Sequence, residues 1–135
     1  MKLVMVVNSE LPLGLIANTA AVMGITVGKL FDEVVGPDIS DADGNLHLGI
    51  TNKVIPILAG TREKIRAIRN RAGQEDNEDI QVIDFSEIAQ ICKSYQDYKD
   101  KFSNMRYEEI YYLGVCLYGP VKKVNKLTGS LPLLR

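Results

Sequence analysis

The sequence predicts a three-layer α/β/α sandwich, and three observations support this fold class. Four runs are rich in β-branched and apolar residues and have the length of strands buried in a sheet. The segments that follow them carry apolar residues at helical spacing. Strands therefore alternate with helices, which places helices on both faces of a mostly parallel sheet. The predicted strands are residues 2–7, 53–60, 80–85 and 109–119.

The composition is that of a soluble globular protein. The chain has 135 residues, of which 46% are hydrophobic and 24% are charged, and its formal net charge is −1. This length suits one domain over residues 1–135, and the charge gives no overall field that would attract nucleic acid or a membrane. Residues 1–14 lack the features of a signal peptide, and we expect no apolar run long enough to span a bilayer. These features predict a cytoplasmic protein.

Few residues have the spacing of metal ligands. Cys92 and Cys116 share no CxxC motif and have no histidine cluster beside them, so we expect no structural zinc. Two isolated thiols suit a reducing compartment. Asp41, Asp43 and Asn45 alternate as in a calcium loop, but the EF-hand register would place isoleucines where carboxylates belong. We predict no metal and no cofactor.

The first predicted strand, residues 2–7, ends at Asn8. Pro12 is placed to start a helix, because its fixed φ suits the first turn. Gly24 is expected to end that helix, as glycine often does at a C-terminus. Residues 28–34 are then expected to form a short second helix.

A small hairpin insertion is predicted near residues 36–50. Asp43-Gly44 is a dipeptide typical of tight hairpin turns, which need positive φ. His47, the single histidine, follows this turn without a visible acid or nucleophile partner. We expect it to be a surface or packing residue.

The second strand, residues 53–60, is expected at an edge of the sheet, because Pro56 cannot donate a ladder hydrogen bond. Thr61 is the expected N-cap of the next helix, and Gly73 is expected to end it. The acidic residues 74–79 then form a solvated connection.

The second half of the chain repeats this order. Ser86, after the third strand, is expected to cap a helical region that breaks near Ser94. Pro120 follows the fourth strand and can start a short final helix. Thr128-Gly129 closes that helix, and the last residues run extended.

Two stretches resemble the archaeal and eukaryotic (second-type) peptidyl-tRNA hydrolases. The first strand and "LPLGLIANTAAVMG" are similar to that family's opening strand and helix. The end, "LGVCLYGPVKKVNKLTGSLPLL", resembles its closing strand, Gly-Pro, short helix, Thr-Gly and Leu-x-Leu-Leu. The resemblance covers most of the chain and implies a mixed four-stranded sheet whose last strand is antiparallel to the rest. It also raises homodimerisation, since the hydrolases commonly pair.

The chain resembles even more closely a set of short bacterial and archaeal proteins, the domain-of-unknown-function 2000 family, which is placed structurally beside those hydrolases. The similar blocks are "VVNSELPLGLIANTAAVMG", "DADGNLHLGI", "DFSEIAQ" and "LYGPVKKVNKLTGSLPLLR". No defined reaction comes with this resemblance.

The hydrolases are thought to use a lysine at the start of the first helix, an aspartate after the third strand and a following threonine. The resemblance places Leu15 at the lysine position, and leucine cannot donate to an oxyanion or a phosphate. Asp84 falls at the aspartate position, which makes it the candidate catalytic residue, although a strand-end aspartate often caps a helix. The nearest hydroxyl to the threonine position is Ser86. The family's glutamine and histidine positions fall on Thr19 and Val22.

The absence of a lysine at Leu15 argues against standard peptidyl-tRNA hydrolysis. Our first hypothesis is a protein that binds or acts on a small ligand in a cleft at the end of strand one, where Asn8, Gly14, Asn18 and Asp84 could converge. The side chains of Asn8 and Asn18 could donate and accept hydrogen bonds there. Their simpler roles are an Asx turn and a buried hydrogen bond.

Two alternatives from other functional classes remain open. The first is a divergent hydrolase acting on peptidyl-tRNA or a related aminoacyl ester, with Asp84 as its base. The second is an RNA-contacting structural module that uses Lys122, Lys123 and Lys126 of the basic tail to contact a few phosphates. A lysine run is otherwise a solvated face. The residues alone do not decide whether the protein is an enzyme.

Overall fold

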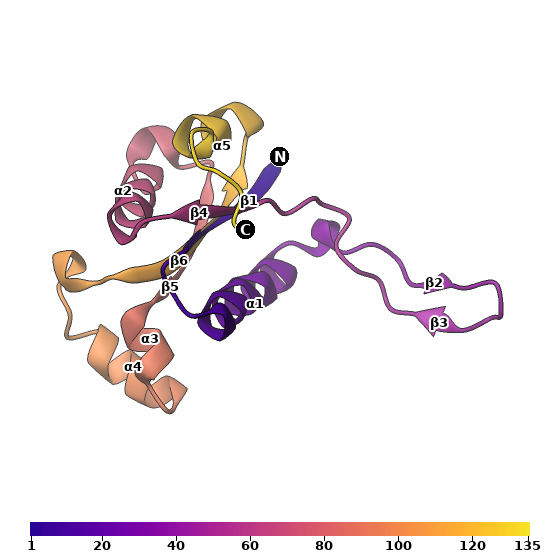
Figure 1. The fold of residues 1–135 in the computed structure, drawn as a ribbon, viewed down its shortest axis with the longest axis horizontal. Coiled ribbons are helices and arrows are strands. Elements are labelled where there is room, and N and C mark those ends of the chain that lie inside the picture. The colour runs from indigo at the N-terminus through magenta and orange to yellow at the C-terminus, as the bar shows by residue number, and fades with distance from the viewer.

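A computed structural model describes residues 1–135. Its four-stranded mixed sheet has the order β4-β1-β6-β5 (Figure 1). β4 pairs with β1 in parallel, whereas β6 is antiparallel to both of its neighbours. The predicted fold class is confirmed, and so is the antiparallel last strand that the family resemblance implies. The strands span Lys2–Asn8 (β1), Ile57–Gly60 (β4), Gln81–Ser86 (β5) and Tyr112–Gly119 (β6).

Helices cover both faces of this sheet (Figure 1). The long helix α1 (Leu13–Leu30) lies on one face, and α2 (Arg62–Ala72) and α5 (Val121–Thr128) lie on the other. The short helices α3 (Glu87–Ile91) and α4 (Tyr95–Phe102) follow the carboxyl end of β5.

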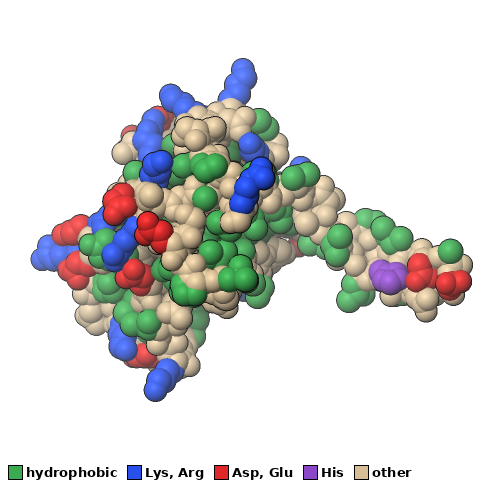
Figure 2. All heavy atoms as spheres, in the orientation of Figure 1, with side chains coloured by type: hydrophobic (Ala, Val, Ile, Leu, Met, Phe, Trp, Pro, Cys, Tyr) green, Lys and Arg blue, Asp and Glu red, His purple; other side chains and the backbone are tan.

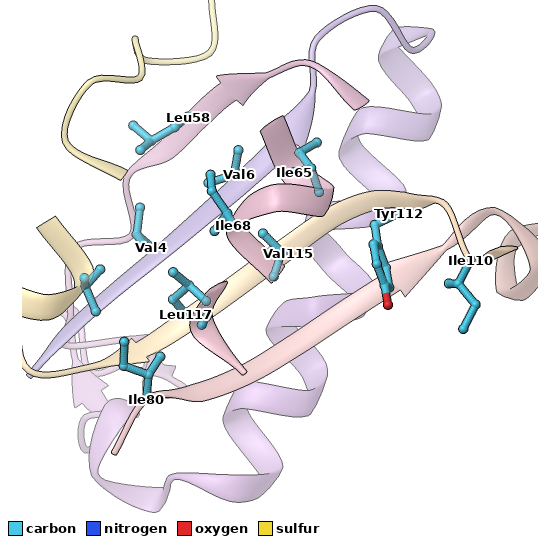
Figure 3. Close-up of a cluster of buried hydrophobic side chains, with 12 residues drawn as sticks. Val4, Val6, Leu58, Ile65, Ile68, Ile80, Ile110, Tyr112, Val115 and Leu117 are labelled. Carbon is cyan, nitrogen blue, oxygen red and sulfur yellow. The ribbon is translucent and has the colours of Figure 1, made fainter. Parts of the chain in front are cut away.

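Strand alternation divides the core into two apolar clusters. In β1, Val4 and Val6 face α2 and α5, and this cluster also contains Ile65 and Leu117 (Figure 3). Leu3, Met5 and Val7 point to the other face and pack under α1. Both sheet faces are thus buried, as the continuous apolar run of β1 predicts.

The prediction that Gly24 ends the first helix is wrong. α1 continues through Gly24 to Leu30, so residues 28–30 belong to α1, and only the 3₁₀ turn Asp32–Val34 is separate. Met23 and Val27 are fully covered by the sheet. Their packing continues the helix past a residue of low helical propensity.

The predicted helix boundaries elsewhere are confirmed. The Thr61 hydroxyl accepts a hydrogen bond from the Lys64 backbone N–H, and Gly73 is the C-cap that follows the last helical residue, Ala72. Ser86 caps α3, and Ser94 caps α4 after the expected break. Two further 3₁₀ turns occupy Glu75–Asn77 and Tyr107–Glu109.

The C-terminal segment completes the sheet. Pro120 precedes α5, and the chain then returns along the outer edge of β4. The Ala59 N–H donates to the Pro132 carbonyl at 2.8 Å, and the Leu134 N–H donates to the Ile57 carbonyl at 2.8 Å. The edge position that Pro56 predicted for this strand is confirmed, and the last residues cover that edge.

One helix, α1, is long and apolar enough to cross a membrane, judged by length and composition alone. It has 18 residues and a mean hydropathy of 1.5. This corrects the expectation that no apolar run reaches that length. Core helices of soluble proteins and signal sequences meet the same criterion.

The predicted hairpin is confirmed and projects from the body (Figure 1). Its strands are Ile39–Ser40 (β2) and Leu46–His47 (β3), and Gly44 adopts a φ of 85° in the turn. The Asp41 carboxylate accepts hydrogen bonds from the backbone N–H groups of Asp43 and Asn45. It also contacts His47 Nε2 at 2.9 Å.

These hydrogen bonds predict a pH limit for the hairpin. The contact with His47, followed by the bonds from Asn45, lowers the pKa of Asp41 to about 2. Because the folded-state pKa is depressed, the stabilisation is complete above the ordinary pKa near 4 and is lost as the pH falls through 2. In an NMR titration, the Asn45 amide signal should keep its folded position down to about pH 3. A titration midpoint for Asp41 near pH 4 would contradict this hydrogen-bond network.

Candidate functional site

A cleft lies beyond the carboxyl ends of β1 and β5, at the place predicted for ligand binding. Its volume is about 390 Å³, which is within the range of small-molecule sites. The cleft is lined mainly by apolar side chains from the β1–α1 turn, α3, β6 and the loop before β6. The lining residues are Leu11, Leu15, Ser86, Glu87, Ile88, Gln90, Ile91, Met105, Glu109, Ile110, Tyr111 and Leu113.

The topology explains why these segments meet. β1 and β5 run in the same direction on either side of β6, so both carboxyl ends lie at one edge of the sheet. The β1–α1 turn brings Leu11 to that edge, and the first turn of α1 brings Leu15. The β5–α3 junction brings Ser86 and Ile88. The chain enters β6 at the same edge and contributes Leu113.

Ser86 contributes an aliphatic hydroxyl to the cleft, but this hydroxyl already caps helix α3. Its side chain is 1% exposed, and its oxygen accepts a hydrogen bond from the Ala89 N–H at 3.3 Å. No His, Lys or Asp lines the cleft. Leu15, at the hydrolase lysine position, and Ser86, the hydroxyl nearest the threonine position, thus meet in one cleft. Its only ionisable acidic side chains are Glu87, which is paired with Arg62, and Glu109.

The charged residues at the rim are partly neutralised. Arg62 forms an ion pair with Glu87 at 3.1 Å, and its Cζ lies 3.5 Å from the centroid of the Tyr111 ring. The Arg62 Nε is buried without a hydrogen-bond partner, so stacking and the ion pair hold this guanidinium in place. Glu109, also in the lining, forms no ion pair. The rim therefore carries no free positive charge from these residues.

The structure does not bring the four predicted ligand residues together. Asn8 is 8% exposed, and its Oδ1 accepts from the Glu10 N–H at 3.0 Å, which is an Asx turn. Gly14 and Asn18 are exposed on α1 and do not line the cleft. Asp84 lies two residues before the end of β5, and strand alternation directs its side chain to the α2 face of the sheet.

Asp84 is held by a structural partner. Its Oδ2 accepts from Arg69 Nε at 2.7 Å, and both side chains are largely buried. Burial alone would lower the pKa of Arg69, but the hydrogen bond with Asp84 and the charge of Asp84, with smaller contributions from Tyr107 and Tyr112, together raise it. Asp84 borders a second hollow of about 660 Å³, between α1 and α4 at the free edge of β5.

The lysines of the tail differ in their surroundings. Lys123 Nζ lies 2.8 Å from Asp79 Oδ1 and donates to the Asp76 carbonyl. Lys122 and Lys126 are exposed. The charge of Lys123 is therefore balanced by its own chain, which leaves two of the three predicted phosphate contacts exposed.

Neither cysteine has the properties of a nucleophile. Burial raises the pKa of Cys116 to about 12. Burial, then the hydrogen bond with Asp97, raises the pKa of Cys92. No three His, Cys, Asp or Glu side chains lie close enough together to hold a metal ion.

Most of the lining residues that were not predicted are apolar, such as Ile88, Tyr111 and Leu113. The sequence contained a signal for them, because they flank strand ends that the predicted topology places at one edge. Apolar side chains carry no individual motif that marks them as site residues. An apolar cleft is therefore predicted from topology rather than from chemically reactive residues.

Comparisons with known proteins identify relatives without a described function. A family model described as "Protein of unknown function (DUF2000)" matches residues 1–135. The solved structure of the protein of unknown function Atu0240 from Agrobacterium tumefaciens strain C58 is similar, with a TM-score of 0.87 and 20% sequence identity. That similarity covers 98% of this chain and 96% of the other, and it shows a shared fold. No curated protein sequence matches.

Proposed function

The chain belongs to the DUF2000 family, and from the chemistry of its cleft we propose that it binds a small, uncharged, largely apolar organic molecule at the end of β1. The observation that carries this proposal is the lining itself. Leu15 stands at the position where the resemblance would place a lysine, and Leu11, Ile88 and Leu113 continue the apolar wall. Burial of an apolar ligand in such a wall is favourable by roughly 25 cal/mol per Å².

The rim disfavours the phosphodiester of a tRNA. Glu109 is unpaired, and the Arg62 guanidinium already faces Glu87 and Tyr111. A phosphate entering the cleft would meet carboxylates rather than free cations, and like charges repel across short distances. This supports binding of a neutral molecule over hydrolysis of peptidyl-tRNA.

A pair of fluorescent probes tests this charge preference. N-phenylnaphthylamine is neutral, and anilinonaphthalene sulfonate has the same ring system with one added negative charge. We expect the neutral probe to bind at least about tenfold more tightly, because the cleft offers apolar surface but no free cation.

A substitution at the cleft mouth locates the probe. Ile91 lines the cleft and is 64% exposed, so Ile91→Glu should place a charge at the mouth at little cost to folding. We expect this change to weaken binding of the neutral probe by roughly tenfold or more, since the apolar contact becomes a charged one. Fluorescence titration measures the dissociation constant.

The matched control is Val121→Glu. Val121 is 48% exposed at the start of α5, near the amino end of β1, whereas the cleft lies at the carboxyl end of that strand. This variant should bind the probe as the wild type does. Equal weakening by both substitutions, or none by Ile91→Glu, would remove the cleft as the site. Turnover of a model peptidyl-tRNA that depends on Asp84 would favour the divergent hydrolase instead.

A further inference from the structure

The projecting hairpin exposes more apolar surface than its own fold can bury. We call residues 35–54 the arm; it extends well away from the sheet and helices (Figure 2). All residues from 37 to 48 are exposed. Six aliphatic side chains of the arm are between 46% and 85% exposed: Val35, Ile39, Leu46, Leu48, Ile50 and Val54.

The arm nevertheless has a defined conformation. Asp41 organises the turn, and the Gly49 N–H donates to Asp38 Oδ1 at 2.8 Å. At the base, a Cβ on Gly49 would collide with the Gly36 carbonyl, so the two backbones approach closely. A lone two-stranded hairpin is marginal in water. Contact with another surface would bury its aliphatic side chains and stabilise it.

The body of the same molecule has a matching apolar surface. In the C-terminal half of α1, Ile25 is 74% exposed, and Leu30, which borders the adjacent hollow, is 57% exposed. Beside it, the hollow between α1 and α4 is walled by Val22 and Leu30 on one side and by Tyr95 and Tyr98 on the other. We call the exposed side of α1 together with this hollow the α1 surface.

The charges of the two surfaces are complementary. The arm contains Asp38, Asp41 and Asp43 and a single basic residue, Lys53, at its base. The only charged residue of α1 is Lys29, and Lys93 borders the hollow. Asp84, which also borders it, is already paired with Arg69. An acidic, apolar arm therefore suits a basic, apolar surface.

We propose that the occupant of the α1 surface is the arm of a second copy of this chain. Both halves of the contact belong to one sequence, so a two-fold axis would form the contact twice and close the assembly. The acidic arm argues against an anionic lipid surface as the occupant, because it would be repelled there. This proposal does not depend on the ligand of the cleft.

Sedimentation equilibrium of the full chain tests the assembly. We expect a dimer, and we expect Leu48→Asp/Ile50→Asp in the arm, or Ile25→Asp on α1, to raise its dissociation constant by roughly a hundredfold. Val121→Asp, an exposed substitution on α5, should leave it unchanged. All four substituted positions are exposed, and circular dichroism checks that each variant is folded. A wild type that stays monomeric at every concentration would overturn the proposal.

Mixing the two kinds of variant tests the exchange of arms. A heterodimer of the arm variant and the α1 variant retains one intact contact, between the wild-type arm of one chain and the wild-type α1 of the other. We expect this heterodimer to form more tightly than either variant pairs with itself. If arms packed on arms, or α1 on α1, no contact would stay intact and mixing would restore nothing. That second result would overturn the proposed geometry.

Discussion

Gly114→Ala is expected to destabilise the fold by about 1–3 kcal/mol, because it overpacks the contact between α1 and the central strand β6. A Cβ at Gly114 would lie 2.7 Å from Thr19 Cγ2 and 3.0 Å from Met23 Cε. Thr19 cannot turn away easily, since it is fully buried and its hydroxyl donates to the Leu15 carbonyl at 2.8 Å. Urea denaturation measures the loss as a change in the free energy of unfolding.

The control for Gly114 is a glycine with open space around it. A Cβ at Gly28, within α1, would have no neighbour within 4 Å. Gly28→Ala should therefore stabilise the protein by roughly 0.5–1 kcal/mol, through helix propensity. The two glycine-to-alanine substitutions should thus change the free energy of unfolding in opposite directions. Equal effects would mean that α1 does not approach β6 as closely as described.

Asp84→Ala is expected to lower the free energy of unfolding by about 1–3 kcal/mol, because it leaves a largely buried guanidinium without its partner. The bond from Arg69 to Asp84 is 2.7 Å long, and the two side chains are only 24% and 21% exposed. Arg69→Met should have a cost of similar size, since it leaves the carboxylate unpaired. Thermal and urea unfolding of the two variants provide the measurement.

The double variant Asp84→Ala/Arg69→Met separates a structural role from a catalytic one. If the pair acts as one unit, the double variant should lose less stability than the sum of the two single losses, by roughly 0.5–3 kcal/mol. Asp84 would instead be a functional residue if its loss left stability unchanged and removed an activity. That outcome would restore it as a candidate base.

Local signals were sufficient to predict the four strands and most helix boundaries, whereas the antiparallel direction of the last strand followed only from the family resemblance. Thr61, Ser86 and Ser94 each cap the helix expected of them, and Pro56 lies in the segment leading into the edge strand. The end of α1 was not predictable in this way. Gly24 is a local stop signal, and it is overridden by the packing of neighbouring side chains against the sheet.

The location of the candidate site could be predicted from topology, but its chemistry could not. Asn8, Asn18 and Asp84 are predicted site residues because polar residues near strand ends often bind ligands. The face to which each of these side chains points changes with a shift of one residue along its strand or helix. Asp84 lies on the α2 face, and Asn18 lies on the outer side of α1. The cleft that forms beside them is lined by apolar residues, which carry no individual motif.

Binding of a neutral molecule in the cleft can be tested directly by methyl NMR of the full chain during titration with N-phenylnaphthylamine. We predict that the methyl signals of Leu11, Leu15 and Leu113, which line the cleft, shift progressively, while those of Val121 and Leu133, at exposed positions elsewhere, stay in place. The sulfonated probe should shift the same signals much less at equal concentration. Unchanged signals from Leu15 and Leu113, or stronger shifts with the sulfonated probe, would contradict the proposed function.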